Sequence, residues 1–407
     1  MATPVHELDL PEIDLFGVAR EEKNARYAAA REEHWLARMP MGYAVMRHAD
    51  VVALLRERRF HSAIALLGQM AGVADEEFAN RQTKSILAME GDPHGRLRRL
   101  VAPAFTPRSA DRLRPFMREV VGGLIDPVVA SGGCELVADV CEPYPIPIVC
   151  ELLGAPKEDW KLFSAWATDI FRIFNGDIAG DLETIKAAMQ ELDAYVRAMI
   201  DERRASTSTY EDLLSDLLAA EEAGDRLSTD ELVMMTEAVL MAGTDTTRNQ
   251  LACAVALFTD FPDQWRLLGE HPELAATAVE ECMRVLGAVR GTARIASEDI
   301  EYRDVLFPAG TLVAISLQSA NFDPAVMETP GDFDITRKQP AQQMTFGSGI
   351  HHCLGASLAR AELQEALPLL ARRMPDLAVD GAIEWKPETF GIWGPARLPL
   401  RFAPSSA

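Results

Sequence analysis

The segment that begins at Ser228 is the strongest constraint on how this chain can fold. Ser228-Thr-Asp-Glu231 is a capping box, in which two side chains satisfy free backbone N–H groups at the start of a helix. The residues that follow, up to Phe258, are apolar on nearly every side of the predicted helix. A helix without a polar face has to pass through the interior of a protein. We therefore expect a large, mainly helical protein built around this segment.

A polar stretch, Ala242-Gly-Thr-Asp-Thr-Thr247, lies in the middle of this helix. Glycine, threonine and aspartate are poor helix formers, and threonine hydroxyls bond back to carbonyl groups and bend the axis, so a kink is predicted. A harmless kink or a solvated patch explains the stretch as well as a functional site does. However, a buried helix does not keep a carboxylate and three hydroxyls without partners.

A glycine-rich loop, Phe346 to Gly355, contains one thiol, Cys353, and precedes the amphipathic segment Ala356 to Arg373. Glycines let a backbone approach a flat ligand and adopt positive φ, and a thiolate is stabilised near a helix N-terminus. These are the properties of an axial metal ligand in a tight loop. The plain alternative is a buried cysteine in a glycine turn, since free cysteine is among the most buried residue types.

Two further pairs of residues stand at helical spacing. His94 and Arg98 share one face of a basic helix, which by itself indicates a solvated basic patch. Glu281 and Arg284 also share a face, and surface pairs of this kind contribute only about 0–1 kcal/mol. Neither pair indicates a function when it is taken alone.

Taken together, these motifs resemble the cytochrome P450 family. Phe346 to Gly355 fills all six fixed positions of Phe-Gly-x-Gly-x-His-x-Cys-x-Gly, the haem-thiolate loop, and the other three motifs occur in the family's order over roughly residues 40 to 402. The resemblance implies a single domain, residues 1–407, that is mainly α with small β-sheets. It places haem b between the long kinked helix and the helix following Cys353.

The resemblance also assigns roles residue by residue. It makes Cys353 the ligand of the haem iron, and Asp245 and Thr246 the catalytic acid and alcohol that deliver protons to bound O2. Gly243 is expected to make room beside the haem, and His94, Arg98 and Arg294 to hold the propionates. The full set of expected cofactor-binding residues is His94, Arg98, Ala242, Gly243, Arg294, Phe346, Gly347, Gly349, His351, Cys353 and Gly355.

Two positions depart from the family pattern. In the family, an arginine further along the chain joins the Glu281–Arg284 pair, but Asp332 stands at the aligned position, and Arg337 is the candidate substitute. Ala288 stands where many members have a proline after the helix.

Composition and patterning exclude several classes of partner. With 62 acidic and 40 basic side chains the formal charge is −22, so nucleic acid and anionic membranes are repelled. The six cysteines show neither a CxxC pair nor a short regular spacing, which argues against a disulfide framework or a zinc site. Residues 1–16 lack a basic n-region and an apolar h-region, and residues 244–250 make the most apolar helix unsuited to a bilayer. We expect a cytoplasmic monomer without membrane insertion.

The predicted function is that of a haem-thiolate monooxygenase that inserts one oxygen atom from O2 into a C–H bond. Because no flavin or iron–sulfur motif is present, the electrons are expected from a ferredoxin and its reductase. The substrate is expected to be small and lipophilic. The residues expected to line its cavity are Leu66, Leu67, Met70, Ile86, Phe171, Phe174, Leu240, Ala242, Ala288, Val289, Ile392 and Trp393. A peroxide-driven peroxygenase and a non-catalytic haem-binding sensor or carrier remain as alternatives.

Overall fold

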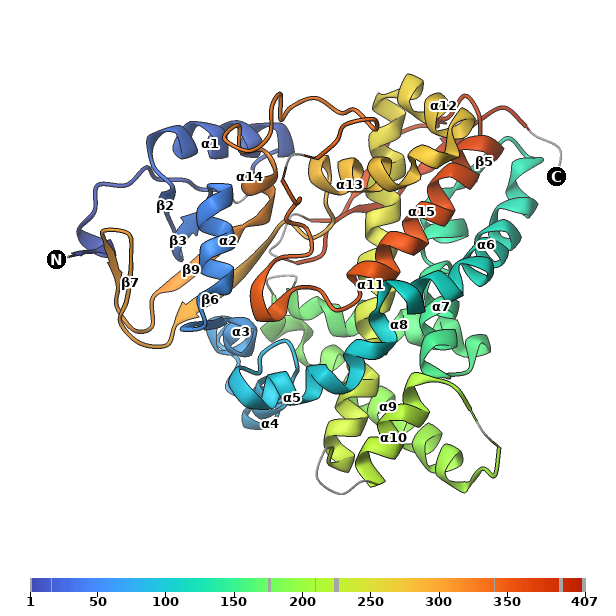
Figure 1. The fold of residues 1–407 in the computed structure, drawn as a ribbon, viewed down its shortest axis with the longest axis horizontal. Helices are drawn as coiled ribbons and strands as arrows, with labels where there is room; N and C mark the ends of the chain where they lie inside the picture. Colours follow the sequence, from blue (N-terminus) through green and yellow to red (C-terminus); the bar gives the residue numbers. More distant parts are fainter. Residues whose placement is uncertain are drawn as a thin grey trace.

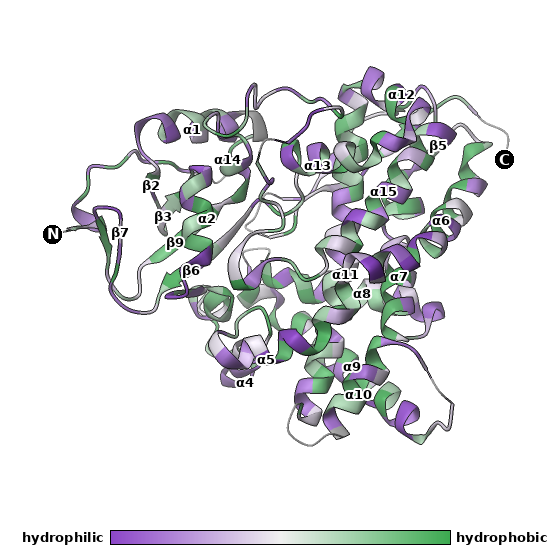
Figure 2. Ribbon diagram, viewed as in Figure 1, coloured by the Kyte–Doolittle hydropathy of each residue, from purple (hydrophilic) through white to green (hydrophobic). Residues whose placement is uncertain are grey.

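The computed structural model describes residues 2–15, 17–174, 177–208, 210–222, 227–339, 341–387 and 391–404. A strand-rich region carries the N-terminus, and a larger helical region carries the C-terminus (Figure 1). Hydrophobic residues follow both the central helices and the strands of the largest sheet (Figure 2). Of the described helices, none is both long enough and apolar enough to cross a membrane.

Helices make up most of the described structure. They are α1 (Arg20–Glu33), α2 (His48–Arg56), α3 (Leu67–Met70), α4 (Glu76–Thr83), α5 (Gly91–Val101), α6 (Pro107–Val129), α7 (Pro145–Leu153), α8 (Trp160–Ile170), α9 (Ile178–Ala205), α10 (Leu213–Glu222), α11 (Thr229–Asp260), α12 (Pro262–Glu270), α13 (Ala275–Val285), α14 (Leu317–Asn321) and α15 (Ala356–Arg373). Short 3₁₀ and π-helical turns connect several of them.

The strands are short and form four small sheets. The largest has the order β2-β3-β9-β6-β4, and the others are β1-β8-β7, β10-β13-β5 and the pair β11-β12. Their bounds are β1 (Thr3–Pro4), β2 (Leu36–Met39), β3 (Gly42–Val45), β4 (Phe60–Ser62), β5 (Gly133–Glu135), β6 (Gly291–Ala296), β7 (Ile300–Tyr302), β8 (Val305–Phe307), β9 (Leu312–Ser316), β10 (Ala378–Val379), β11 (Glu384–Trp385), β12 (Pro395–Arg397) and β13 (Pro399–Arg401). In the largest sheet β3 pairs with β9 in parallel, and the other neighbours are antiparallel.

The helix α11 is the longest described helix and passes through the helical core, as its apolar sequence predicted. The capping box is present, because Ser228 Oγ accepts the Glu231 N–H and the Glu231 carboxylate accepts the Ser228 N–H. The helices α7, α8, α9 and α15 pack around it. Side chains such as Leu251 and Phe258 are fully buried there.

Local patterning of the sequence predicts one helix over Glu21–Arg38 and an irregular stretch over Phe60–Met89, and it indicates no helix over residues 262–270. The structure differs at all three places. The helix expected over Glu21–Arg38 ends at Glu33, because residues 36–39 pair as β2 with β3. The stretch Phe60–Met89, expected to be irregular, contains β4 and the short helices α3 and α4. The helix α12 was not predicted, although Pro262 at its first turn is a usual start signal.

Candidate active site

The middle of α11 presents one open face. Ala238, Ala242 and Thr246 recur every four residues and keep accessible surface on an otherwise buried helix. Thr246 Oγ1 donates to the carbonyl oxygen of Ala242 at 2.9 Å, and Thr244 Oγ1 donates to that of Leu240 at 2.7 Å. The expected back-bonding is therefore confirmed, and it occurs without a break in the helix. From this accessible stripe we infer a hollow beside α11.

Gly243 has a packing role that sequence reasoning missed. A Cβ atom at this position would overlap the side chain of Val149 in α7. The glycine therefore lets α7 and α11 pack closely, and the space it makes is filled by α7. Its neighbour Ala242 is the exposed residue of the two, on the side of the hollow.

Asp245 is buried and lies among charged groups. It forms an ion pair with Arg248, one turn along α11, and its Oδ1 lies 3.9 Å from Lys386 Nζ. Arg248 also lies 3.7 Å from Glu142, whose side chain is 37% exposed. Burial lowers the pKa of Lys386, and the Asp245 carboxylate opposes that change. Sequence reasoning missed these partners, although Arg248 stands three residues after Asp245, at a spacing that shares a helix face.

The loop before α15 depends on two glycines with positive φ. Gly347 has a φ of 68° and Gly349 a φ of 72°, a region that other residues rarely adopt. A Cβ on Gly349 would also overlap the carbonyl group of Leu55 in α2. The Cys353 N–H donates to the carbonyl oxygen of Phe346 at 2.9 Å, which closes the loop just before α15 begins.

The side chain of Cys353 is exposed, yet protein surrounds it. Burial raises the pKa of this thiol, and the Gly355 N–H and the charges of Arg98 and Arg360 oppose the rise. A group that is both accessible and desolvated lines an internal hollow and not the outer surface. The same N–H group and guanidinium groups favour the thiolate form, which is the form that binds metals.

A cluster of basic side chains from distant segments lies next to this loop. Arg98 in α5 donates to the carbonyl oxygen of His352, and the rings of His94 and His351 are 4.6 Å apart. The His94 side chain is 3% exposed, and its ring forms no hydrogen bond with another described residue. Burial lowers its pKa to about 4, with smaller contributions from His351 and Arg98. His94 is thus neutral at pH 7 and keeps its ring N–H for a ligand.

Arg294 in β6 and Glu90 complete this cluster. The Arg294 side chain is almost fully buried, and burial lowers its pKa while Glu90 opposes the change. Glu90 pairs with His351 Nε2 at 3.0 Å and accepts the Ser62 N–H at 2.7 Å. Burial alone would raise the pKa of Glu90, but these bonds lower it. Glu90 was not predicted, because only its position just before α5 distinguishes it in the sequence.

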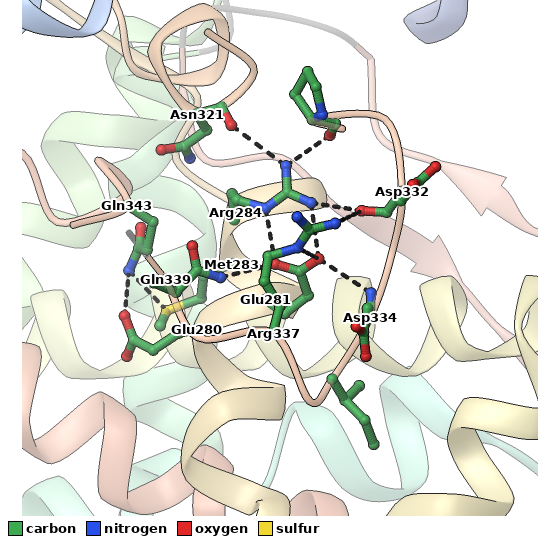
Figure 3. Close-up of polar contacts among 12 residues, drawn as sticks. Glu280, Glu281, Met283, Arg284, Asn321, Asp332, Asp334, Arg337, Gln339 and Gln343 are labelled. Atoms are coloured by element: carbon green, nitrogen blue, oxygen red, sulfur yellow. Dashed lines mark hydrogen bonds and ion pairs between the residues drawn. The ribbon is translucent and has the colours of Figure 1, made fainter. Parts of the chain in front are cut away.

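The Glu281–Arg284 pair is completely buried and holds the segment that leads to the Cys353 loop (Figure 3). The two side chains form two hydrogen bonds of 2.8 Å, and Arg284 also donates to the carbonyl oxygens of Pro330 and Asp332 at 2.7 Å. Arg337 Nε donates to Glu281 Oε1 at 3.1 Å. Arg337 is therefore the third charged member, while Asp332 takes part through its backbone.

A second ion pair, which sequence reasoning missed, reaches the Cys353 loop directly. Arg360 in α15 forms two hydrogen bonds to Glu280 in α13, of 2.5 and 3.1 Å. The Arg360 guanidinium carbon also lies 4.5 Å from the centre of the Phe346 ring, a cation–π contact. Glu280 and Glu281 thus brace the loop from adjacent positions of one helix.

The donor set around the hollow fits a haem. One thiol supplies a soft ligand, and the described residues contain no group of three His, Cys, Asp or Glu side chains that could hold a bare metal ion. Cβ atoms on Gly347 or Gly355 would meet nothing within 4 Å, so the backbone beside the thiol is open to a flat ligand. Buried His and Arg side chains at the margin suit the carboxylates of a tetrapyrrole.

Comparisons with known proteins agree with this chemistry. The model of the family described as cytochrome P450 matches residues 157–270 and 264–374. Luteothin monooxygenase of Streptomyces thioluteus is 36% identical over 409 residues, 99% of each chain, and nocardicin C N-oxygenase of Nocardia uniformis subsp. tsuyamanensis is 38% identical over 92% of this chain and 94% of the relative. The crystal structure of CalO2 superposes with a TM-score of 0.89 at 32% identity, covering 97% of this chain and all of CalO2.

Proposed function

Because this chain belongs to the cytochrome P450 family and is a monooxygenase with a haem-thiolate cofactor, we propose that Cys353 is the thiolate ligand. We also propose that the enzyme inserts one oxygen atom from O2 into a C–H bond of a small lipophilic substrate. Cys353 itself carries the proposal, since it is the one cysteine of the six with an exposed side chain. When bound, the haem supplies the iron at which O2 is activated, and its thiolate ligand favours O–O cleavage.

In this proposal the haem lies between α11 and α15. The stripe of Ala242 and Thr246 faces it on the side of O2, and Phe346, Gly347, Gly349 and Gly355 contact it on the side of Cys353. The glycine φ values and the open space beside Gly347 and Gly355 support this placement. The buried Glu281–Arg284 and Glu280–Arg360 pairs keep the loop in its position.

The basic cluster is proposed to bind the propionates. His94, Arg98, Arg294 and His351 present donors that are poorly solvated, and hydrogen bonds between such groups and carboxylates are strong. Glu90 binds His351 through Nε2, which leaves Nδ1 for a propionate and fixes the orientation of the ring.

Asp245 and Thr246 are proposed to deliver protons during O2 activation. The Thr246 hydroxyl proton points to the Ala242 carbonyl oxygen, so the lone pairs of Oγ1 remain free to accept a proton-bearing partner. Glu142, Arg248 and Asp245 form a polar line from the surface to the residue before Thr246. Because a guanidinium does not give up its proton, water molecules along this line would carry the protons past Arg248.

Two segments that we propose to cover the substrate, residues 60–89 and residues 171–174, meet in the structure, and their apolar contact supports a lipophilic substrate. Leu67 of α3 and Phe174 pack against one small hydrophobic cluster around Phe78 and Ile173. Some expected cavity residues are turned away, however: Leu240 is fully buried, and Ala288 and Trp393 are 2% and 3% exposed. Of the expected residues on α11, Ala242 therefore remains the one that can touch a substrate.

A ferredoxin-type donor is proposed to dock where α5 reaches the surface beside the Cys353 loop. Arg99 is exposed there and suits an acidic partner. Arg96 and Arg360 are instead engaged in partly buried ion pairs with Glu231 and Glu280. Arg99 is therefore the better candidate for a direct contact.

We further propose that residues 1–407 act as one cytoplasmic domain and as a monomer. The main hydrophobic cluster draws residues from Leu97 to Phe402, which supports a single domain. All six cysteines are free, which suits a reducing compartment.

The ferrous CO complex tests the proposal. We expect the wild-type protein, after reduction and treatment with CO, to show the red-shifted Soret band of thiolate ligation. Cys353→Ser should lose that band, while the control Cys134→Ser, at a partly buried cysteine, should keep it. Persistence of the band in Cys353→Ser would overturn the assignment. Turnover with hydrogen peroxide that equals turnover with NAD(P)H and ferredoxin would instead support a peroxygenase.

A further inference from the structure

Two segments far apart in the sequence join beside the middle of α11. Residues 286–290 connect α13 to β6, and residues 391–394 form a turn between β11 and β12. They pair through the isolated bridge between Val289 and Ile392 and through a 2.9 Å hydrogen bond from the Trp393 N–H to the Ala288 carbonyl oxygen. The two paired segments form one unit. This unit, residues 286–290 together with residues 391–394, is called the 286–290 wall.

The side chain of Gln250 attaches this wall to α11. Its Nε2 donates to the carbonyl oxygen of Leu286 at 3.1 Å, and its Oε1 accepts the Ala288 N–H at 2.9 Å. Gln250 is 5% exposed, so water has little access to either bond. Both ends of one amide group therefore fix the wall, at a point one helical turn beyond Thr246.

The bond to Gln250 gives a physical reason for Ala288. A proline at this position, which many P450 members have, lacks the N–H that Gln250 accepts. Without that N–H, the buried Oε1 atom of Gln250 would have no donor, which costs about 1–3 kcal/mol of stability. Gln250 and Ala288 are thus matched to each other in this chain.

The wall is not packed tightly on every side. A cavity with room for about one water molecule adjoins it, lined by Leu286, Gly287, Val289, Arg290 and Arg284 among others. The wall can therefore shift toward this cavity if its attachment to α11 is lost.

The position of the wall connects it to the site. One end is tied to Gln250, next to the Asp245–Thr246 pair, and the other continues into β6, which carries Arg294 of the basic cluster. Val289, which is half-buried, lies between these two points. The wall thus runs from the centre of the site to its margin.

We propose that Gln250 is a positioning residue that sets the distance of the 286–290 wall from the haem and so determines the size of ligand the site accepts. The inference rests on the proposed function, because it takes the hollow beside Thr246 as the space for substrate. Gln250 itself touches neither substrate nor haem; it acts through Leu286 and Ala288.

The test compares two haem ligands of different size in the ferric holoenzyme. Imidazole is too small to reach the wall, whereas 4-phenylimidazole extends toward it. The ratio of their spectral dissociation constants therefore reports the position of the wall. Gln250→Leu should change this ratio by about tenfold, the effect of a misfit of one or two methylene groups, with imidazole binding unchanged. Ala288→Pro should change it in the same direction, and the double variant by less than the product of the two single effects, because both break the same bond.

Gln264→Leu is the matched control. Gln264 Oε1 also accepts a backbone N–H, that of Ile335 at 3.0 Å, but at the far end of the helical core. The Gln264→Leu variant should lower the melting temperature and leave the ratio of the two dissociation constants unchanged. An unchanged ratio in Gln250→Leu and Ala288→Pro, or an equal change in Gln264→Leu, would overturn the proposal. If Gln250→Leu does not retain haem, Ala288→Pro alone decides.

The experiment separates this inference from the proposed function. Failure of the proposed function appears as a wild-type protein without the thiolate CO band. Failure of the inference appears as an intact band in every variant together with an unchanged ligand ratio.

Discussion

Two buried glutamates in this protein, Glu281 in α13 and Glu362 in α15, have opposite electrostatic surroundings. Both are at most 2% exposed. Around Glu281, burial would raise the pKa, but hydrogen bonds and charge from Arg284 and further donors from residues 334–339 lower it. Around Glu362, burial raises the pKa to about 8, and only a hydrogen bond from the Thr247 hydroxyl opposes the rise. Glu362 Oε1 has no hydrogen-bond partner among the described residues.

The difference shows that the donors around a buried carboxyl, and not its depth, decide whether it is ionised. Glu281 is an ionised member of a saturated network and acts as a brace. Glu362 holds a proton at neutral pH. Asp245 is intermediate in its bonding: Arg248 and Lys386 supply positive charge, yet its buried Oδ1 lacks a hydrogen bond of good geometry. A carboxyl with charged partners and an incomplete set of hydrogen bonds suits a group that exchanges protons.

The largest effect is expected from breaking the saturated network. Arg284→Ala leaves an ionised carboxylate buried with too few donors, so the free energy of unfolding of the holoenzyme should fall by about 3–5 kcal/mol at pH 7. The loss should be smaller at pH 5 than at pH 8, because Glu281 can then take up a proton. Urea denaturation at these pH values measures both. Arg26→Ala, in an exposed i,i+4 pair with Glu22, is the control. If Arg284→Ala loses no more stability than Arg26→Ala, the prediction is contradicted.

The next effect concerns the unsaturated glutamate. Since the folded state holds the Glu362 proton up to about pH 8 while the unfolded chain releases it near its ordinary value, the folded state loses stability as the pH rises between these values. Glu362→Gln removes that loss, so its stability relative to wild type should rise by about 2–4 kcal/mol from pH 5 to pH 8. Unfolding free energies across this range test it, with Glu298→Gln at an exposed site as control. Parallel profiles of wild type and Glu362→Gln would refute it.

The intermediate case should separate activity from stability. Asp245→Asn keeps the shape of the side chain but cannot accept and release a proton, so product formation with NAD(P)H and ferredoxin should drop about 100-fold. The free energy of unfolding should change by less than in Arg284→Ala. The assay uses the compound that gives the largest substrate-induced spectral shift in a screen of terpenoids, steroids and fatty acids. Asp260→Asn, at the exposed end of α11, is the control. If Asp245→Asn forms product as fast as Asp260→Asn does, the proton role of Asp245 is ruled out.

The smallest effect is expected at the edge of the saturated network. Arg337→Gln removes one charge-assisted bond to Glu281 but leaves Arg284 in place, so it should cost about 1–2 kcal/mol of stability. Urea denaturation alongside Arg284→Ala gives the comparison. If the two variants lose equal stability, Arg337 matters to Glu281 as much as Arg284 does, and the prediction is wrong.

Local features of the chain were predictable, because they depend on residues close together in the sequence. The capping box at Ser228–Glu231 and the helix Ala356–Arg373 appear with the predicted bounds. The positive φ values of Gly347 and Gly349 and the hydroxyl bonds of Thr244 and Thr246 also follow from side-chain chemistry within one turn or loop. The motif around Cys353 was sufficient to recognise the family.

Only the tertiary structure decided which distant groups meet. It placed Val149 against Gly243, gave Arg337 the third place beside Glu281, and used the Ala288 N–H to bind Gln250. No local pattern contains this information, because it depends on how segments 38 to 94 residues apart pack and on the few tenths of an ångström that separate a contact from an overlap. The sequence by itself determined the chemistry available to this protein, and the packing of its helices determined which of those groups share a site.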